Sequence, residues 1–170
     1  PFCKYLGVSF DKEEVAVART RLDKAVLMED LEINLANSGA KHGSIDCIIY
    51  NNYLELLNNP EEILKLHSNY LKDDGVIIAT IPNVQYWKVL EKLVQSEWCG
   101  KATPNQLNYF TINNIVRLYD KAGLKFFDAL PVRQDSSPEF EKFAEAAKPL
   151  AAALGIEPAR FRQQASCPFY

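Results

Sequence analysis

The amino-acid sequence predicts an α/β protein with a mostly parallel, doubly wound sheet. Four short apolar segments, typical of parallel strands that are covered on both faces, lie at residues 5–10, 24–28, 45–50 and 76–81. Segments with helical hydrophobic periodicity separate them, beginning with residues 12–22. Because strands that alternate with amphipathic helices belong to βαβ units, we expect all four strands to run in the same direction.

Composition favours a single globular domain spanning residues 1–170. Of these 170 residues, 48% are hydrophobic and 24% are charged, which suffices for one ordinary core. The formal net charge of -3 lacks the excess of Lys and Arg that a phosphate-backbone binder needs, so nucleic acid is not an expected partner. No apolar run approaches the roughly 18 residues of a membrane span, and no signal segment opens the chain. We therefore expect a cytoplasmic protein that does not bind membranes.

The four cysteines, Cys3, Cys47, Cys99 and Cys167, are scattered along the chain. They form no C-x-x-C pair and have no histidine at metal-ligand spacing. We expect buried free thiols, with no metal site and no dense disulfide framework.

Turn and capping residues place the first elements. Asp11, with Glu14 three residues later, is an acidic variant of the capping box and predicts the start of the helix over residues 12–22. The strand at residues 24–28 ends at Glu29 and Asp30. A polar loop follows.

The next helix begins at Pro60, where Asn59 is the predicted N-cap. Residues 73–75 (Asp-Asp-Gly) then predict a turn into the strand at 76–81, which Pro82 ends.

The second half of the chain is more helical. Residues 84–97 form a predicted helix, and Thr111 caps another that stops at Gly123. Residues 124–132 are typical of a strand, whereas 138–154 have helical periodicity that Pro149 must kink or divide. The last residues, 165–170, resemble the start of a strand.

Three stretches resemble the class I S-adenosylmethionine-dependent methyltransferase family of the small-molecule type. Residues 7–19 (GVSFDKEEVAVAR) are similar to its second strand and following helix. Residues 45–83 resemble the block in which a strand beginning near an Asp, an L-E-H-like element and a helix lead to a strand that runs into Pro-Asn. Residues 107–129 (LNYFTINNIVRLYDKAGLKFFDA) are similar to the F-T…A-G segment near the family's C-terminus.

The resemblance implies a Rossmann-like sheet of strand order 3-2-1-4-5-7-6 with a C-terminal antiparallel strand pair. This chain would supply strands 2 to 7 of that fold, without strand 1 and its glycine-rich loop, so we expect an N-terminally truncated domain. Residues 124–132 would run antiparallel to the sheet and pair with a strand near 165–170.

The resemblance also implies cofactor-binding residues at the carboxyl ends of the strands, where open α/β sheets bind ligands. Ser9 stands where the family commonly has a carboxylate for the ribose hydroxyls, and Phe10 would lie against adenine. Asp30 would accept from the adenine amino group, with the N–H of Leu31 near the ring. The alternatives are a helix-capping role for Asp11, which follows two residues after Ser9, a place in the core for Phe10 and a solvated position for Asp30.

Asn51 and Asn52 match the stretch that lines the methionine end of the cofactor, and Asn83, Tyr86 and Tyr109 match the acceptor side. Aromatic residues bury large areas in any core, so the two tyrosines have a structural alternative.

Two departures from the family pattern weaken a role in acid–base chemistry. Leu56 and Gln106 stand where many relatives have histidine, and no catalytic residue is predicted. The function implied is transfer of a methyl group from S-adenosylmethionine to a small metabolite or sugar-type acceptor. The alternative is a catalytically degenerate binding or assembly domain. The sequence makes no prediction of the oligomeric state.

Overall fold

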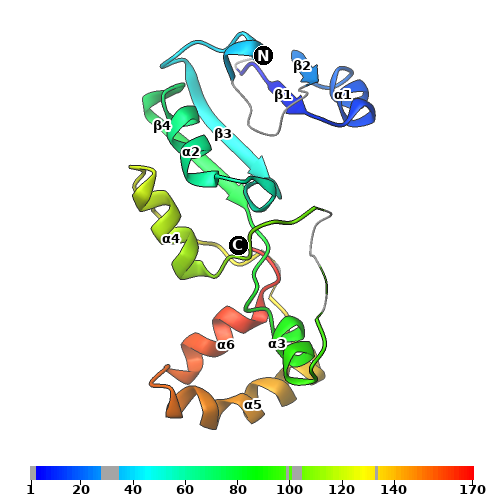
Figure 1. The fold of residues 1–170 in the computed structure, drawn as a ribbon, viewed down its shortest axis with the longest axis vertical. Coiled ribbons are helices and arrows are strands. Elements are labelled where there is room, and N and C mark those ends of the chain that lie inside the picture. Colours follow the sequence, from blue (N-terminus) through cyan, green and yellow to red (C-terminus); the bar gives the residue numbers. More distant parts are fainter. Residues whose placement is uncertain (1–2, 28–34, 99, 101–104, 133) are drawn as a thin grey trace. The chain divides into compact units, whose positions relative to one another are not determined.

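The structure is a computed structural model that describes residues 3–27, 35–98, 100, 105–132 and 134–170 (Figure 1). The chain divides into two compact units, one made of Pro1–Ile48 with Asn59–Ile78 and the other of Ile49–Asn58 with Ala79–Tyr170. The two long strands β3 and β4 contribute residues to both. The helices and strands are β1 (Leu6–Ser9), α1 (Lys12–Ala18), β2 (Lys24–Leu27), η1 (Leu35–Ser38), β3 (Ile45–Asn51), η2 (Leu54–Leu56), α2 (Pro60–Ser68), β4 (Leu71–Thr80), α3 (Trp87–Val94), α4 (Ile112–Lys121), α5 (Pro138–Ala153) and α6 (Pro158–Ser166).

The first unit begins with a βαβ element, drawn in blue in Figure 1. β1 and β2 pair in parallel, with Leu6 opposite Lys24 and Ser9 opposite Leu27. Helix α1 contacts both strands and buries Val15. It starts where predicted, because the carboxylate of Asp11 accepts hydrogen bonds from the N–H groups of the first turn.

β3 and β4 form a second two-stranded sheet. The N–H of Ile45 donates to the carbonyl of Tyr70 at 2.9 Å, and that of Asn52 donates to Thr80 at 3.1 Å. Both strands therefore run in the same direction. The four predicted strands are confirmed in position and are parallel within each pair. Among the described residues they form two separate two-stranded sheets, β1-β2 and β3-β4, rather than one.

The prediction of a turn at residues 73–75 is wrong, because β4 already begins at Leu71 and continues through them. Pairing with β3 outweighs the local turn preference of Asp-Asp-Gly. Gly75 has a steric role in this strand, since a Cβ there would lie 3.0 Å from the carbonyl oxygen of Ile45.

Two predicted helix caps are confirmed. The side chain of Asn59 accepts from the N–H of Glu62 at the start of α2, and Thr111 with Asn114 forms a capping box at the start of α4. Gly123 ends α4 with a positive φ of 76°. Helix α3 is shorter than predicted and begins only at Trp87.

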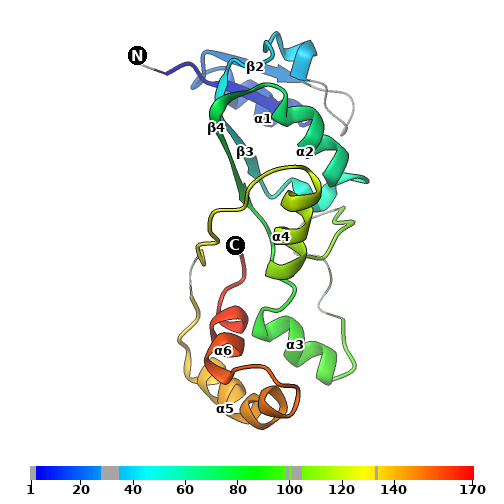
Figure 2. The same cartoon turned by 90° about the vertical axis from the view of Figure 1, so that its left-hand side faces the viewer.

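The second unit contains a helical hairpin, α5 and α6, which Figures 1 and 2 both show as neighbouring helices. Pro149 lies inside α5, which is continuous rather than divided. Trp87, Phe140, Ala144 and Ala165 form a buried cluster between this hairpin and the start of α3, with Phe143 and Phe161 packed against it. Helix α6 was not predicted from the sequence.

The C-terminal residues pair antiparallel with the segment that follows β4. Ile81 and Tyr170 exchange hydrogen bonds of 2.8 and 3.0 Å, and Pro82 bridges Phe169. The predicted strand at 165–170 is thus not formed, because Ala165 and Ser166 end α6 and only an isolated antiparallel bridge at Phe169 follows.

Residues 124–132 form no strand in the structure, which contradicts the prediction. The N–H of Val132 donates to the carbonyl of Phe169 at 3.2 Å, which links this segment to the C-terminal residues. Phe127 and Leu130 are largely exposed, so two of its large apolar side chains lack the burial that stabilises a strand.

Candidate functional site

Ser9 and Phe10 lie at the carboxyl end of β1, as predicted. The Ser9 hydroxyl donates to the carboxylate of Glu14 at 2.7 Å and accepts from the N–H of Asp11 at 3.1 Å. Phe10 is 45% exposed. The Ser9 side chain therefore supports the start of α1 beside Asp11, whose predicted capping role is confirmed. Asp30 and Leu31, the predicted adenine contacts, lie outside the described residues.

Asn51 and Asn52 lie at the carboxyl end of β3. Asn51 is the last residue of the strand and is exposed. Asn52 has a positive φ of 49°, a conformation that Asn tolerates better than most residues. Its side-chain oxygen Oδ1 is buried and has no hydrogen-bond donor among the described residues.

A buried acceptor without a donor is costly, and such groups in folded proteins call for an explanation. Here the oxygen and the left-handed backbone coincide at one residue, at a strand end where open α/β sheets bind ligands. The arrangement at Asn52 suits a ligand that brings an N–H or O–H donor.

Asn83 follows β4 and is 3% exposed. Its amide nitrogen donates to the carbonyl oxygens of Gln164 and Cys167, each at 2.8 Å, and its Oδ1 accepts from the N–H of Gln85 at 2.9 Å. Both amide hydrogens are therefore committed within the protein. The side chain joins the end of β4 to the C-terminal segment.

Tyr86 and Trp87 converge on one carboxylate, that of Asp135. The Tyr86 hydroxyl donates to Oδ2 of Asp135 at 2.9 Å, and the indole Nε1–H of Trp87 donates to the same oxygen at 2.7 Å. The other oxygen, Oδ1, accepts from the N–H of Ser137 at 2.9 Å. Burial raises the pKa of Asp135, but hydrogen bonds from Ser137, Trp87 and Tyr86 outweigh it and hold the pKa below its usual range.

Tyr109 is 38% exposed, and its ring meets that of Trp98 edge-on, with ring centroids 5.3 Å apart. The neighbouring Gln106 is buried and donates to the carbonyl of Asn108 at 2.9 Å. The N–H groups of Leu107 and Asn108 both donate to the carbonyl of Glu55, so this loop is tied to η2. Gln106 therefore has a structural partner at the position where relatives have histidine.

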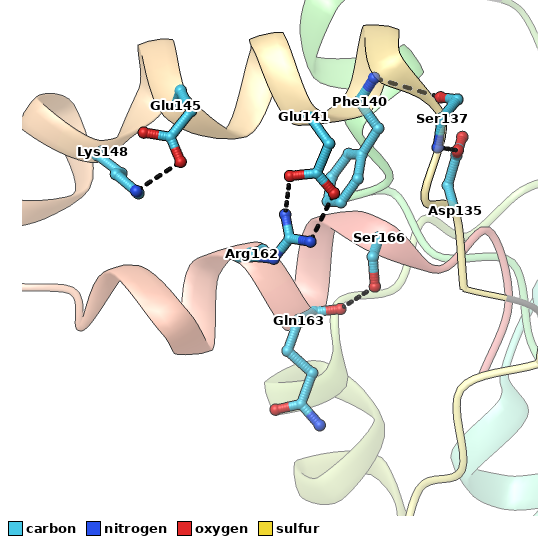
Figure 3. Close-up of polar contacts among 9 residues, drawn as sticks. All are labelled: Asp135, Ser137, Phe140, Glu141, Glu145, Lys148, Arg162, Gln163 and Ser166. Carbon is cyan, nitrogen blue, oxygen red and sulfur yellow. Dashed lines mark hydrogen bonds and ion pairs between the residues drawn. The ribbon is translucent and has the colours of Figure 1, made fainter.

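A hollow of about 520 Å³ opens beside the helical hairpin of the second unit. Its wall includes Gln134, Asp135 and Ser136 from the segment before α5, with Phe140, Arg162 and Ser166 from the helices. Figure 3 shows Arg162 reaching from α6 to Glu141 on α5, where the guanidinium donates two hydrogen bonds of 2.8 and 2.6 Å to the carboxylate. The guanidinium also lies 5.1 Å from the ring centroid of Phe140.

Asp135 was not predicted from the sequence. Its partners Trp87 and Tyr86 are 48 and 49 positions away, so no local spacing signals the contact. The prediction of buried cysteines is correct for Cys167 and wrong for Cys3 and Cys47, which are exposed. Within the described ranges, no three His, Cys, Asp or Glu side chains gather as metal ligands do. None of the helices described there has the length and apolarity of a bilayer-spanning segment.

Comparison with known proteins identifies the family. The family model described as a methyltransferase domain matches residues 2–128, about three-quarters of the chain. No curated protein sequence matches the chain.

Solved structures share the fold. A Thermotoga maritima S-adenosylmethionine-dependent methyltransferase, described as a possible histamine N-methyltransferase, is similar with a TM-score of 0.56 and 21% identity over 71% of this chain and 55% of its own. An Archaeoglobus fulgidus S-adenosylmethionine-dependent methyltransferase is similar with a TM-score of 0.58 and 12% identity, over 96% of this chain and 71% of its own.

A third similar structure is a chain of the Haloferax volcanii complex between the Trm112 methyltransferase activator and a methyltransferase. Its TM-score is 0.55 and its identity 15%, over 76% of this chain and 54% of its own. The chain thus spans only about half the length of the Thermotoga and Haloferax chains that it resembles. The family match over residues 2–128 and the shared Rossmann-like fold lead to one conclusion: the chain belongs to the methyltransferase domain family and has the fold of S-adenosylmethionine-dependent methyltransferases.

Proposed function

We propose that this chain is part of an enzyme that transfers the methyl group of S-adenosylmethionine to a small metabolite or sugar-type acceptor. The family match supports methyl transfer in general. The observation in the structure that carries the proposal is the buried, donor-less Oδ1 of Asn52 at the carboxyl end of β3.

The residues at this strand end fit the methionine end of the cofactor. S-adenosylmethionine carries an ammonium group, which is a hydrogen-bond donor of the kind that Oδ1 of Asn52 lacks. The exposed side chain of Asn51, next to it, offers a second amide. We propose that both asparagines hold this end of the cofactor.

When bound, the cofactor supplies an activated methyl group on a sulfonium, a good leaving group. The chain's own task is therefore to orient the acceptor in line with the methyl group and to exclude water, more than to move protons. This is compatible with a structural role for the buried Gln106 and with Leu56, which cannot act as acid or base.

On the acceptor side we propose Tyr86 and Tyr109 as contacts. Asn83 was predicted as a third, but its amide hydrogens are both used within the protein, so we propose that it acts by holding the C-terminal segment in place. The Thermotoga protein's description makes histamine one sensible amine to test as acceptor.

The alternative proposal is a degenerate methyltransferase-like domain that binds or assembles without catalysis. Ser9 favours this alternative. Its hydroxyl already binds Glu14 and Asp11, and it cannot accept hydrogen bonds from both ribose hydroxyls as a carboxylate would. A complex with a protein partner, as in the Haloferax structure, would suit either proposal.

One experiment separates the two. The intact protein is titrated with S-adenosylmethionine by calorimetry and then incubated with cofactor carrying a tritiated methyl group and a panel of amines and sugars, histamine among them. Binding with transfer to a panel member supports the enzyme. Binding without transfer to any member of the panel would favour the degenerate domain, and no binding would contradict the cofactor assignment.

A further inference from the structure

The polar groups of Asp135 connect three elements of the second unit. Its carboxylate accepts from Tyr86, Trp87 and Ser137, and its own N–H donates to the carbonyl of Ser166 at 2.7 Å. One residue therefore joins the start of α3, the N-cap of α5 and the end of α6.

Trp87 makes this junction rigid. It is only 4% exposed, and its ring packs against Phe140 and Phe143 with centroid distances of 6.2 and 5.8 Å. Because the indole is fixed by the core, the carboxylate that accepts its N–H is fixed as well, and Tyr86 is held to that carboxylate. The Tyr86 ring lies edge-on to the indole, at 71° and 6.1 Å between centroids.

Asp135 is also one of the residues that line the hollow of about 520 Å³ beside the hairpin. Asp135 therefore borders this open space and at the same time binds Tyr86, the tyrosine proposed to contact the acceptor.

We propose that Asp135 is a positioning residue of the acceptor side, which fixes the phenol of Tyr86 through the hydrogen bond to its Oδ2. The proposal rests on the proposed function, since it assigns Asp135 a role in acceptor binding. Asp135 acts through Tyr86 and need not touch the reacting atoms.

An Asp135→Asn variant tests the junction, because an amide cannot replace the carboxylate here. Both carboxylate oxygens accept from N–H or O–H donors, whereas an amide has one acceptor oxygen and one donor nitrogen. In either orientation, the amide NH₂ of the variant would face a donor. If the NH₂ faces Tyr86 and Trp87, both of their hydrogen bonds are lost. If it faces Ser137, they remain but donate to a neutral amide oxygen, so the contacts of Tyr86 and Trp87 are weakened or lost in both cases.

The first readout is independent of activity. The chain has two tryptophans, and the exposed Trp98 can be replaced by Phe so that the indole Nε1–H signal in a proton–nitrogen spectrum belongs to Trp87 alone. In this Trp98→Phe background, Asp135→Asn is expected to move the Trp87 Nε1–H resonance upfield, since a charge-assisted hydrogen bond is lost. An unchanged resonance would contradict the hydrogen bond between Trp87 and Asp135, and with it the proposal.

The second readout is kinetic and uses protein with Trp98 in place. With whichever panel acceptor the wild type methylates, Asp135→Asn and Tyr86→Phe are each expected to raise the acceptor KM roughly two- to tenfold, the worth of one hydrogen bond. The acceptor KM of the double variant should not exceed that of the more impaired single variant, because both substitutions affect the same hydrogen bond. The affinity for S-adenosylmethionine should stay unchanged.

Glu141→Gln is the matched control, since it weakens the ion pair with Arg162 on the same hairpin without touching Tyr86 or Trp87. A rise in acceptor KM with Glu141→Gln equal to that with Asp135→Asn would overturn the positioning role and indicate general loosening of the hairpin. An unchanged acceptor KM in Asp135→Asn would overturn it too. Absence of methyl transfer in the wild type would instead refute the proposed function.

Discussion

The amide nitrogen of Asn83 donates a 2.8 Å hydrogen bond to the carbonyl oxygen of Cys167, 84 positions later in the chain. The same nitrogen donates to Gln164, and the backbone N–H of Asn83 donates to Pro168 at 2.8 Å. A single buried side chain therefore fastens the last residues of the chain to the end of β4.

Replacing Asn83 by Asp is expected to destabilise this attachment. The variant keeps an oxygen for the N–H of Gln85 but turns two donors into a carboxylate oxygen that faces two carbonyls. Leaving buried polar groups unpaired costs about 1–3 kcal/mol each, so unfolding in urea should show a loss of at least this size. The exposed Asn113→Asp is the control, and equal midpoints for both variants would contradict the role of Asn83.

Phe140 is expected to be the most sensitive position of the helical hairpin. It is fully buried against Trp87, so Phe140→Ala should cost about 3–5 kcal/mol in the free energy of unfolding. Phe127 is 79% exposed, and Phe127→Ala should change stability by no more than about 0.5 kcal/mol. Similar losses in thermal unfolding for the two variants would show that the hairpin core is not packed as described.

Acid should diminish the stabilising effect of Asp135. Because hydrogen bonds hold its folded pKa below the ordinary value of about 4, its contribution is present above that value and is lost as the pH falls toward the folded pKa. The stability difference between wild type and Asp135→Asn should be constant from about pH 5 to 7 and shrink below about pH 4. Urea unfolding across this range measures it, with the exposed Asp120→Asn as control. A stability difference between wild type and Asp135→Asn that does not depend on pH would contradict the claim that the Asp135 carboxylate is ionised.

Alkaline conditions should unfold the protein through its buried tyrosines. Burial raises the pKa of Tyr119 to about 12, and it also raises that of Tyr50 together with the neighbouring Tyr119 and Tyr53. A phenol whose pKa is raised in the folded state stabilises the protein at pH values below its unfolded-state pKa of about 10. This contribution is lost as the pH rises toward the folded-state pKa. Tyrosinate absorption and circular dichroism should change together above about pH 10, and less steeply in Tyr119→Phe. The exposed Tyr5→Phe should leave the dichroism curve unchanged.

Local signals in the sequence were sufficient for the strands at the start of the chain and for helix caps. Asn59 and Thr111 cap α2 and α4 as predicted, because a cap depends on side chains within three residues of the helix start. The predicted turn at 73–75 failed, because pairing with β3, 25 positions earlier in the sequence at the Ile45–Tyr70 backbone hydrogen bond, keeps those residues in a strand.

The candidate site was predictable to the extent that strand ends identify it. Asn52 was predicted from its place after β3, but its positive φ and the burial of its oxygen are consequences of the fold. Asp135 was missed since its role arises only when the hairpin brings it to Tyr86 and Trp87. Asn83 was predicted as an acceptor contact, whereas its partners in the structure lie in a C-terminal segment that no local pattern connects with β4.

The calorimetric titration of S-adenosylmethionine into the intact protein and its Asn52→Gly variant tests the account most directly. Glycine keeps the left-handed backbone of Asn52 and removes only the buried oxygen that has no donor among the described residues. We predict that the intact protein binds the cofactor and that the Asn52→Gly variant binds it about ten- to a hundredfold more weakly. The ligand-free variant should be no less stable, because an unsatisfied buried group is gone, and Asn113→Gly in α4 should leave affinity unchanged. Equal affinity of wild type and Asn52→Gly, or no binding by either, would contradict the central claim.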